Sequence, residues 1–296
     1  MDSIDAGSPH LIMCTVLEKT NHATIARTVR NALRLLWPTK EHEENIFLAF
    51  LTDSAVYMLK VAGALQVFYP KMIHITCIVH GLHRAAEEIH LQHPKANNLI
   101  SSIKKVFVKA PARTALFKEE LPEIPLPPEP VLTRWGIWIN ATLYYCSHIE
   151  DIKKVLHLLN PEDAACINSA VLAADDVGIQ SELSYIGAYI KTIPETMTKL
   201  EERGLQLTTA VSLLNTVTAS FNKLPGSLGR ILTEKMKKIE ERNPGLETVK
   251  KISGILQGEP QTVQNYTPKE IAAFKYCPLN SYEVERTFSV YEEHTC

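Results

Sequence analysis

The sequence lacks several features that would place it in a specialised class of proteins. It has no run of about 18 apolar residues, so no membrane-spanning helix is expected. Its N-terminus, MDSIDAGSPH, is polar and acidic and does not resemble a secretory signal. The six cysteines are scattered without a CxxC pair, which gives no support to a disulfide framework or a four-cysteine zinc site. A reducing compartment, either cytosol or nucleus, is therefore expected.

An excess of basic residues is also missing. The formal net charge is -2, whereas a protein that lives on DNA usually shows a basic surface. The charge balance thus argues mildly against strong non-specific DNA binding, although it leaves room for a local basic face. The chain has 296 residues, of which 45% are hydrophobic and 22% charged, enough for one large domain or two ordinary ones with a real core.

The first third of the chain alternates between short apolar runs and amphipathic segments. Buried strands are predicted at HLIMCTVL (10–17), IFLAFL (46–51) and MIHIT (72–76). Helices are predicted at 23–37, 54–68 and 77–93, the first of them after a cap at Thr20-Asn21. This order predicts a layered α/β arrangement.

After Pro94 the pattern becomes helical throughout. Helical spacing of apolar residues recurs in eight segments: 95–109, 132–145, 147–159, 162–173, 177–191, 206–223, 227–242 and 246–256. The five prolines of LPEIPLPPEP (121–130) predict an extended loop, and a second linker is expected at 258–268. The last piece, 270–293, is predicted as two helices broken at Pro278.

Asp53 is the first residue whose position indicates chemistry. It follows an apolar strand and precedes a helix, and ligands of α/β sheets bind outside the carboxyl ends of the strands. A carboxylate there could hold a hard divalent ion such as Mg²⁺. The alternative is a helix N-cap, which an Asp in this position also provides.

CIVHGLHR (77–84) places Cys77 and His80 three residues apart on one helix face. The pair could support a metal ion or a DNA strand nearby. A zinc site would need two more ligands, and no second pair stands at finger spacing. The alternative is a buried cysteine beside a histidine that is satisfied within the fold.

Two segments in the helical part contain residues typical of nucleic-acid contacts. Arg134 and Trp135 open a helix that also contains Trp138, and an Arg beside an aromatic ring can grip a phosphate and stack on a base. The stretch 95–118 holds six basic residues and no acidic one, among them Lys104, Lys105 and Lys109. The alternatives are core tryptophans and a solvated basic face.

Near the end of the sequence, PLNSYEVERTFS (278–289) puts Glu283, Glu285 and Arg286 on one short helix that Ser281 can cap. A glutamate on a helix is usually a solvated surface charge. By itself the segment therefore indicates no chemistry.

Taken together, four of these blocks resemble the hAT superfamily of DNA transposases, named after hobo, Activator and Tam3. They are LTDSAVYMLKVAGAL (51–65), HITCIVHGLHRAAEEI (74–89), TRWGIWINA (133–141) and PLNSYEVERTFS (278–289). Their order and separations are similar to those of the family, from about Val16 to Val290. In this resemblance Asp53 corresponds to the second catalytic carboxylate and Glu285 to the third.

The resemblance implies an α/β ribonuclease H-like core that is interrupted by a large all-α insertion domain. The expected parts are a partial core at 10–93, the insertion at 94–267, and a closing core helix with a dimerisation region at 268–296. It implies Mg²⁺ ions held by two Asp and one Glu for in-line attack on phosphorus. Arg134 and Trp135 would handle a DNA strand, while Cys77 and His80 would support the site.

The sequence departs from the family at its first catalytic Asp. Only nine residues precede the strand expected at 10–17, too few for two further strands. We therefore expect an inactive, transposon-derived fragment in the nucleus or cytoplasm, with weak or no Mg²⁺ binding. Its ancestral partners would be transposon-end DNA and a second copy of itself. Two alternatives stay open: a domesticated DNA- or protein-binding module, and an active transposase whose gene model starts too late.

Overall fold

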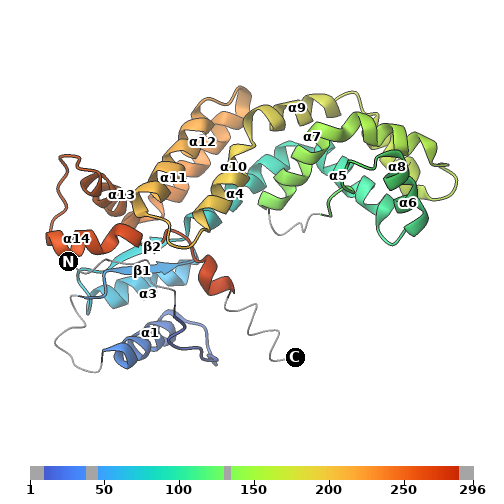
Figure 1. Cartoon of the computed structure of the whole chain (residues 1–296). Helices are drawn as coiled ribbons and strands as arrows, with labels where there is room; N and C mark the ends of the chain where they lie inside the picture. The colour runs from blue at the N-terminus through green and yellow to red at the C-terminus, as the bar shows by residue number, and fades with distance from the viewer. Residues whose placement is uncertain (1–9, 38–45, 130–134, 287–296) are drawn as a thin grey trace. The chain divides into compact units, whose positions relative to one another are not determined.

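A computed structural model describes residues 10–37, 46–129 and 135–286 (Figure 1). It divides into two compact units, and each is described by itself. The first, the sheet unit, consists of Met1–Gly81, Thr198–Thr218 and Glu234–Cys296. The second, the helical unit, consists of Leu82–Met197 and Ala219–Thr233. The division cuts across the expected parts, because residues 198–218 and 234–267 group with the sheet.

The sheet of the first unit has two parallel strands, β1 (Ala49–Thr52) and β2 (Ile73–Thr76), within the described residues. Ala49 pairs with Ile73 and Thr52 with Thr76. All four residues of β2 are buried, whereas β1 is mostly half-buried. Parallel neighbours need a crossover connection, and α3 (Val56–Gln66) supplies it. The next helix, α4 (Ile78–Gln92), begins directly after β2.

Helix α1 (His22–Leu36) packs against α3 and forms an apolar core with it. Asn21 caps α1, since its Oδ1 accepts a hydrogen bond from the backbone N–H of Thr24 at 3.0 Å. The buried side chains come from both helices and from the turn after α3: Ala26, Leu33, Val61, Ala62, Leu65, Tyr69 and Met72. This packing stabilises the two helices and positions α1 relative to α3.

The outer edge of β2 is completed by a side chain instead of a third strand. Asn243 precedes α13 (Pro244–Leu256) and is 1% exposed. Its Oδ1 accepts a hydrogen bond from Thr76 N at 3.0 Å, and its Nδ2 donates to Thr76 O at 2.9 Å. A β-carbon at Gly245 would collide with the backbone oxygen of His74, so only glycine lets α13 approach this closely.

The end of the described chain belongs to the sheet unit as well. It contains α14 (Pro268–Ala273), the 3-10 turn η1 (Phe274–Tyr276) and a helical stretch at 282–286. Thr267 and Glu270 form a reciprocal capping box at the start of α14. Glu270 also receives Lys71 Nζ at 2.6 Å, which ties α14 to the turn before β2.

Between α4 and α13 the described residues form helices and connecting loops, and no strand. They are α5 (Pro94–Phe107), α6 (Pro111–Glu120), α7 (Trp135–Leu158), α8 (Ala165–Ala174), α9 (Ile179–Tyr189), α10 (Thr192–Leu200), α11 (Leu207–Asn222) and α12 (Gly226–Glu241). In the helical unit α5 packs on α8 and α7 packs on α9. No described helix is both long and apolar enough to cross a membrane.

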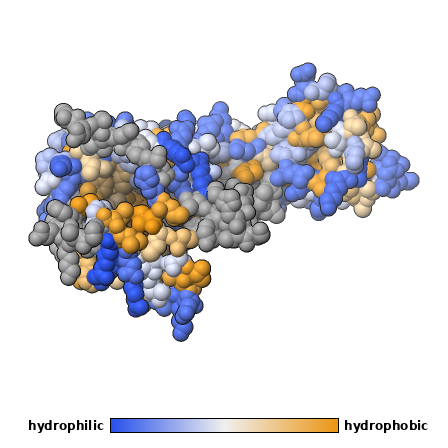
Figure 2. Space-filling view, turned by 60° about the horizontal axis from the view of Figure 1, so that its bottom comes forward, coloured by the Kyte–Doolittle hydropathy of each residue, from blue (hydrophilic) through white to orange (hydrophobic). Residues whose placement is uncertain are grey.

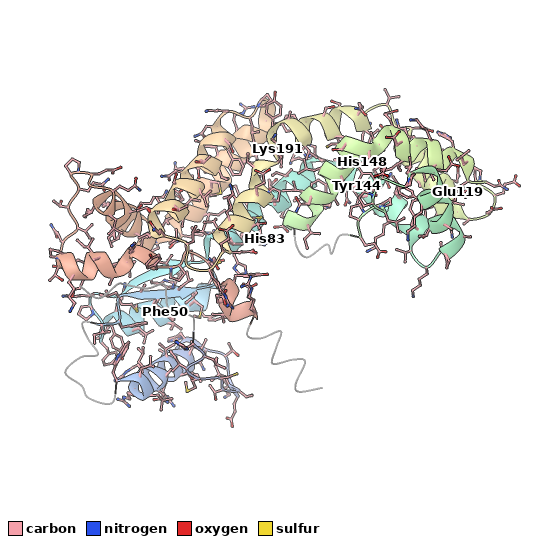
Figure 3. All side chains as sticks on the ribbon, viewed as in Figure 1. Phe50, His83, Glu119, Tyr144, His148 and Lys191 are labelled. Atoms are coloured by element: carbon pink, nitrogen blue, oxygen red, sulfur yellow. The ribbon has the colours of Figure 1, made fainter. Side chains whose placement is uncertain are left out.

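In the helical unit, hydrogen bonds hold the proline-rich segment and the first turn of α5 in place. Tyr144 of α7 donates a hydrogen bond from its hydroxyl to the backbone oxygen of Pro125 at 2.6 Å. One turn further, its ring lies 4.9 Å from the ring of His148 (Figure 3). Glu182 of α9 accepts from Ala96 N at 2.9 Å and so stabilises the first turn of α5.

The mixed character expected from the sequence, a small α/β part joined to many helices, is confirmed. The extended loop at 121–130 is also confirmed for its described residues, 121–129. The boundary expected at 146 is wrong, because α7 runs through it as one helix of 24 residues. Helices α6 and α10 were not anticipated. Whether the sheet is part of a ribonuclease H-like core stays a prediction.

The strand expected at 10–17 is wrong. No residue of HLIMCTVL is paired in the structure, and Leu11 and Val16 are 65% and 95% exposed. Strand formation requires a partner that satisfies the backbone, and β1 and β2 pair only with each other among the described residues. Hydrophobic side chains of this segment therefore stay exposed, among them Leu11, Ile12 and Val16. Figure 2 shows that hydrophobic residues, in orange, reach the visible face of the molecule.

Replacing Asn243 with Ala should destabilise the sheet unit strongly. Both Thr76 backbone groups would lose their partner, and a buried unsatisfied group costs about 1–3 kcal/mol, so the free energy of unfolding should fall by about 2–4 kcal/mol. Urea denaturation followed by circular dichroism measures the change. Asn140, exposed on α7, is the matched control, and its replacement by Ala should change the value by less than about 0.5 kcal/mol. An equal effect of the two changes would contradict the role of Asn243.

Candidate functional site at the ends of the two strands

Asp53 lies directly after β1 with its side chain exposed. Its Oδ1 accepts a hydrogen bond from Ala55 N at 3.2 Å, so it closes a tight turn of the kind that Asp and Asn favour. Helix α3 begins only at Val56, and its N-cap is Ala55. The N-cap alternative for Asp53 is therefore wrong: the carboxylate stabilises the turn before the helix and remains at the carboxyl end of β1.

Cys77 and His80 lie at the equivalent end of β2. The Cys77 backbone N–H continues the ladder by donating to Thr52 O at 2.8 Å. The Cys77 side chain is buried, with 4% of the residue exposed. One helical turn later, the His80 side chain keeps 42% of its surface exposed. The pair thus combines an enclosed sulfur with an imidazole that reaches the surface.

The segment 279–286 packs across the start of α4. Leu279 O accepts a hydrogen bond from Ile78 N at 2.9 Å, and Ser281 N donates to Cys77 Sγ at 3.3 Å. The Asn280 amide donates to the backbone oxygen of Leu200 in α10. These contacts join three stretches that are remote in sequence, and they set where the following glutamates lie.

The two glutamates of this segment have different partners. Glu283 forms a bidentate ion pair with Arg203, with both N···O distances at 2.9 Å. Glu285 accepts a hydrogen bond from Ser281 Oγ at 3.2 Å, and its Oε1 lies 3.6 Å from His80 Nε2. Arg203 therefore binds one carboxylate and leaves Glu285 beside the imidazole.

The electrostatics of the site centre on His80. Its pKa is raised from the ordinary value of 6.5, first by a polar interaction with the Cys77 side chain and then by the negative charges of Glu285 and Asp53, which together outweigh burial. The enclosed Nδ1 of His80 has no hydrogen-bond partner among the described residues, so the interaction with the sulfur is a close contact, not a well-formed hydrogen bond. These neighbours therefore favour the protonated imidazole more than water does.

The pKa of Cys77 is lowered despite its burial. Burial is the largest influence and raises it, but interactions with His80 and with the Ser281 backbone N–H reverse the sign. A lowered thiol pKa favours the thiolate, the form that acts as nucleophile or metal ligand. The described neighbours of the sulfur therefore stabilise negative charge on it.

The structure places Glu285 beside His80, one helical turn after Cys77, and puts Asp53 at the end of the neighbouring strand, where its charge contributes to the raised pKa of His80. Asp53 and Glu285 are carboxylates, the ligand type that Mg²⁺ prefers. Within the part of the chain that the structure describes, however, no group of three or more His, Cys, Asp or Glu side chains stands ready to hold a metal ion.

The anticipated nucleic-acid residues fall in the helical unit. Lys105 and Lys109 are exposed, and Lys104 is half-buried at the end of α5. Trp138 is fully buried with its ring 5.0 Å from that of His90, which confirms the core alternative for this residue. Arg134 and the side chain of Trp135 lie outside the described residues.

Two residues that shape the site were missed in the sequence, Asn243 and Arg203. Each acts on a partner far away along the chain, so no local spacing reveals it. The RNPG run at 242–245 is the one signal available, because an Asn followed by Pro and Gly marks a special backbone position.

The chain gives no match when compared with models of known protein families or with curated proteins. Its membership of the hAT superfamily therefore stays a proposal based on the four blocks quoted above.

The raised pKa of His80 can be tested by NMR titration of its ring. In the folded protein His80 should titrate above 6.5; Cys77→Ala should lower this pKa most, and Glu285→Gln should lower it less. A raised folded pKa means that protonated His80 adds stability below pH 6.5, and this stability is lost as the pH rises through the folded value.

Glu202→Gln, which removes an exposed acid elsewhere in the sheet unit, is the matched control and should leave the His80 titration unchanged. Titration of His80 at or below 6.5 in the unmodified chain would rule out the proposed electrostatics.

Proposed function

We propose that this chain is an hAT-like, transposon-derived protein that no longer cuts DNA and retains nucleic-acid or protein binding at most. The observation that carries the proposal is that Glu285 lies 3.6 Å from His80, at the strand ends where Asp53 follows β1, and that both acids raise the pKa of His80. These acids come from opposite parts of the chain and were singled out from the sequence as the second and third carboxylates of the family.

The position of the acids supports this proposal. Ligands of open parallel sheets bind outside the carboxyl ends of the strands, where Asp53 follows β1 and Cys77 follows β2. In a ribonuclease H-like core, β1, α3, β2 and α4 would form one half of the catalytic layer. The close contact of the 279–286 segment with α4 then supplies the last carboxylate.

Loss of cleavage is proposed because in-line attack on phosphorus by two metal ions needs more than two carboxylates to hold both ions. Among the described residues no group of three or more His, Cys, Asp or Glu side chains is placed to hold a metal ion. When bound, magnesium would activate the attacking water and stabilise the leaving oxygen. In this chain the negative charges of Asp53 and Glu285 instead raise the pKa of His80. Ser281 Oγ donates a hydrogen bond to Glu285 and so orients it.

A nicking assay tests this proposal. Purified chain is incubated with Mg²⁺ or Mn²⁺ and a supercoiled plasmid that carries the genomic sequences on both sides of its coding region. The expected result is no nicking above the level of Asp53→Ala, because two carboxylates hold the metal pair poorly.

Nicking by the unmodified chain that Asp53→Ala and Glu285→Gln both abolish would sink the proposal of an inactive protein. It would favour an active transposase. Equal low nicking by all three proteins would indicate a contaminating nuclease and would leave the unmodified chain without activity of its own, as proposed.

A second candidate function, a DNA-binding module, is favoured by the lysines at the end of α5. Lys95 is paired with Asp176 at 2.6 Å, and Arg113 donates to Cys166 Sγ at 3.2 Å, so part of the basic stretch is already engaged. Lys104, Lys105 and Lys109 form no ion pair with any described residue. Unpaired lysines on one helix end suit the phosphates of duplex DNA.

Gel-shift titration of a duplex at low salt tests the lysine surface. Replacing Lys104, Lys105 and Lys109 with Glu should abolish a shift seen with the unmodified chain, because repulsion replaces phosphate contacts. An equal charge change at Lys235, Lys237 and Lys238 of α12 is the control and should leave the shift in place. No shift at low salt counts against this second function.

A further inference from the structure

Helix α1 carries three arginines and no acidic residue in the sequence HATIARTVRNALRLL. Arg27, Arg30 and Arg34 follow one another at intervals of three and four residues, which places them on one face of the helix. At a rise of about 1.5 Å per residue the row is about 10 Å long, enough to contact two or more successive phosphates. This concentration of charge contrasts with the net charge of -2 for the whole chain.

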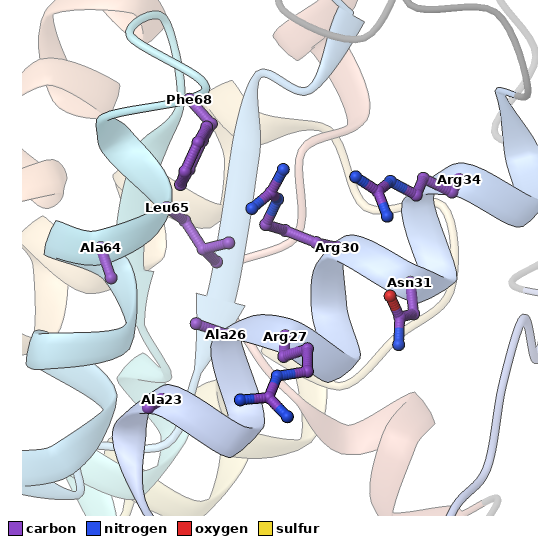
Figure 4. Close-up of a pocket in the computed structure, with 9 residues that line it drawn as sticks. All are labelled: Ala23, Ala26, Arg27, Arg30, Asn31, Arg34, Ala64, Leu65 and Phe68. Atoms are coloured by element: carbon purple, nitrogen blue, oxygen red, sulfur yellow. The ribbon is translucent and has the colours of Figure 1, made fainter.

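The arginines line a pocket of about 240 Å³ between α1 and α3 (Figure 4). Its floor is apolar and includes Ala26 and Leu65, both buried, while Phe68 stands at the rim with 44% of its surface exposed. In Figure 4 the side chain of Arg30 extends from α1 toward Phe68. The pocket thus combines three guanidinium groups with an apolar floor and an aromatic ring.

Arg30 and Phe68 form a stacked pair. The guanidinium carbon of Arg30 lies 3.9 Å from the centre of the Phe68 ring, a cation–π contact. Stacking holds the guanidinium plane in place while its N–H groups remain available for a phosphate. A preorganised Arg loses less entropy when a ligand binds than a mobile one does.

None of the three arginines forms an ion pair with a described carboxylate. Three like charges within two turns of a helix repel one another, and an anionic ligand relieves that repulsion. We propose that this arginine pocket binds single-stranded nucleic acid. Arg27 and Arg34 contact backbone phosphates, and a base stacks on the Arg30–Phe68 pair.

The apolar floor distinguishes a single strand from a duplex. A duplex keeps its bases stacked inside and presents phosphates and grooves, so it leaves the floor and Phe68 unused. An unpaired base has two free faces and stacks on aromatic rings or guanidinium planes without regard to sequence. An anionic membrane is a poorer fit, because the apolar face of α1 is already packed on α3 through Ala26 and Leu33.

The inference rests on the proposed nucleic-acid binding and adds to it a location and a strand type. Its test is fluorescence anisotropy with a labelled oligothymidine of about 15 nucleotides, a length suited to one single-strand site. Changing Arg27, Arg30 and Arg34 together to Ala should weaken binding by about 30-fold or more. The slope of log Kd against log salt concentration should fall by about 1.4, since each of the two lost single-strand phosphate contacts, at Arg27 and Arg34, contributes about 0.7.

Conservative variants separate stacking from charge. Arg30→Lys keeps the charge but loses the planar stack, so binding should weaken by about fivefold or more. Arg27→Lys and Arg34→Lys should change binding by about twofold or less, because a phosphate accepts either cation. Changing Lys235, Lys237 and Lys238 to Ala is the matched control, and urea denaturation of each variant checks that the fold is kept.

Several results would overturn the inference. They are equal binding of a duplex of the same length, binding of phosphatidylserine vesicles but not of the oligonucleotide, and a triple arginine variant that binds within about twofold of the unmodified chain. If the lysine variant of α5 alone loses binding, the arginine pocket is not the site, yet the DNA-binding function survives. If the unmodified chain binds no nucleic acid at all, both fail.

Discussion

The two-stranded sheet depends on the pairing of the Asn243 amide with the backbone of Thr76. A sheet of two strands is marginal by itself, and an open edge on β2 would leave buried backbone groups without partners. The Asn243 side chain supplies one acceptor and one donor in the geometry of a neighbouring strand, and Gly245 lets α13 follow it closely. The end of β2, and with it the start of α4, is thereby held in place for the residues of the site.

Two histidines near the end of β2, His74 and His80, show how the surroundings of a side chain change its pKa. His74 lies inside β2 and accepts or donates a hydrogen bond with Thr52 Oγ1 at 2.8 Å. Burial lowers its pKa and so favours the neutral imidazole. His80, six residues later, lies beside Glu285 and interacts with Cys77, and its pKa is raised. The same side chain therefore serves as a cross-strand partner in one case and as the charged centre of a site in the other.

Charge in this chain is balanced overall but separated locally. In the sheet unit, Asp53 and Glu285 gather at the strand ends, while α1 carries three arginines and no acid. The net charge of -2 is the sum over such regions, so it does not indicate the charge of any one surface. The sheet unit therefore presents a cluster of arginines on α1 and acidic side chains at the strand ends.

Local rules in the sequence determined much of the outline. They located α1 with its Asn21 cap, both paired strands, and Asp53 at the end of the first strand, since each depends on neighbours within a few residues, whereas Glu285 was indicated only by the family resemblance. They missed α6 and α10, which contain a proline in the first turn, Pro111 and Pro194, where a helix tolerates it. Only the tertiary structure decided that HLIMCTVL has no strand partner and that Glu285 meets His80. Both outcomes depend on contacts between segments far apart in the chain, which no local pattern encodes.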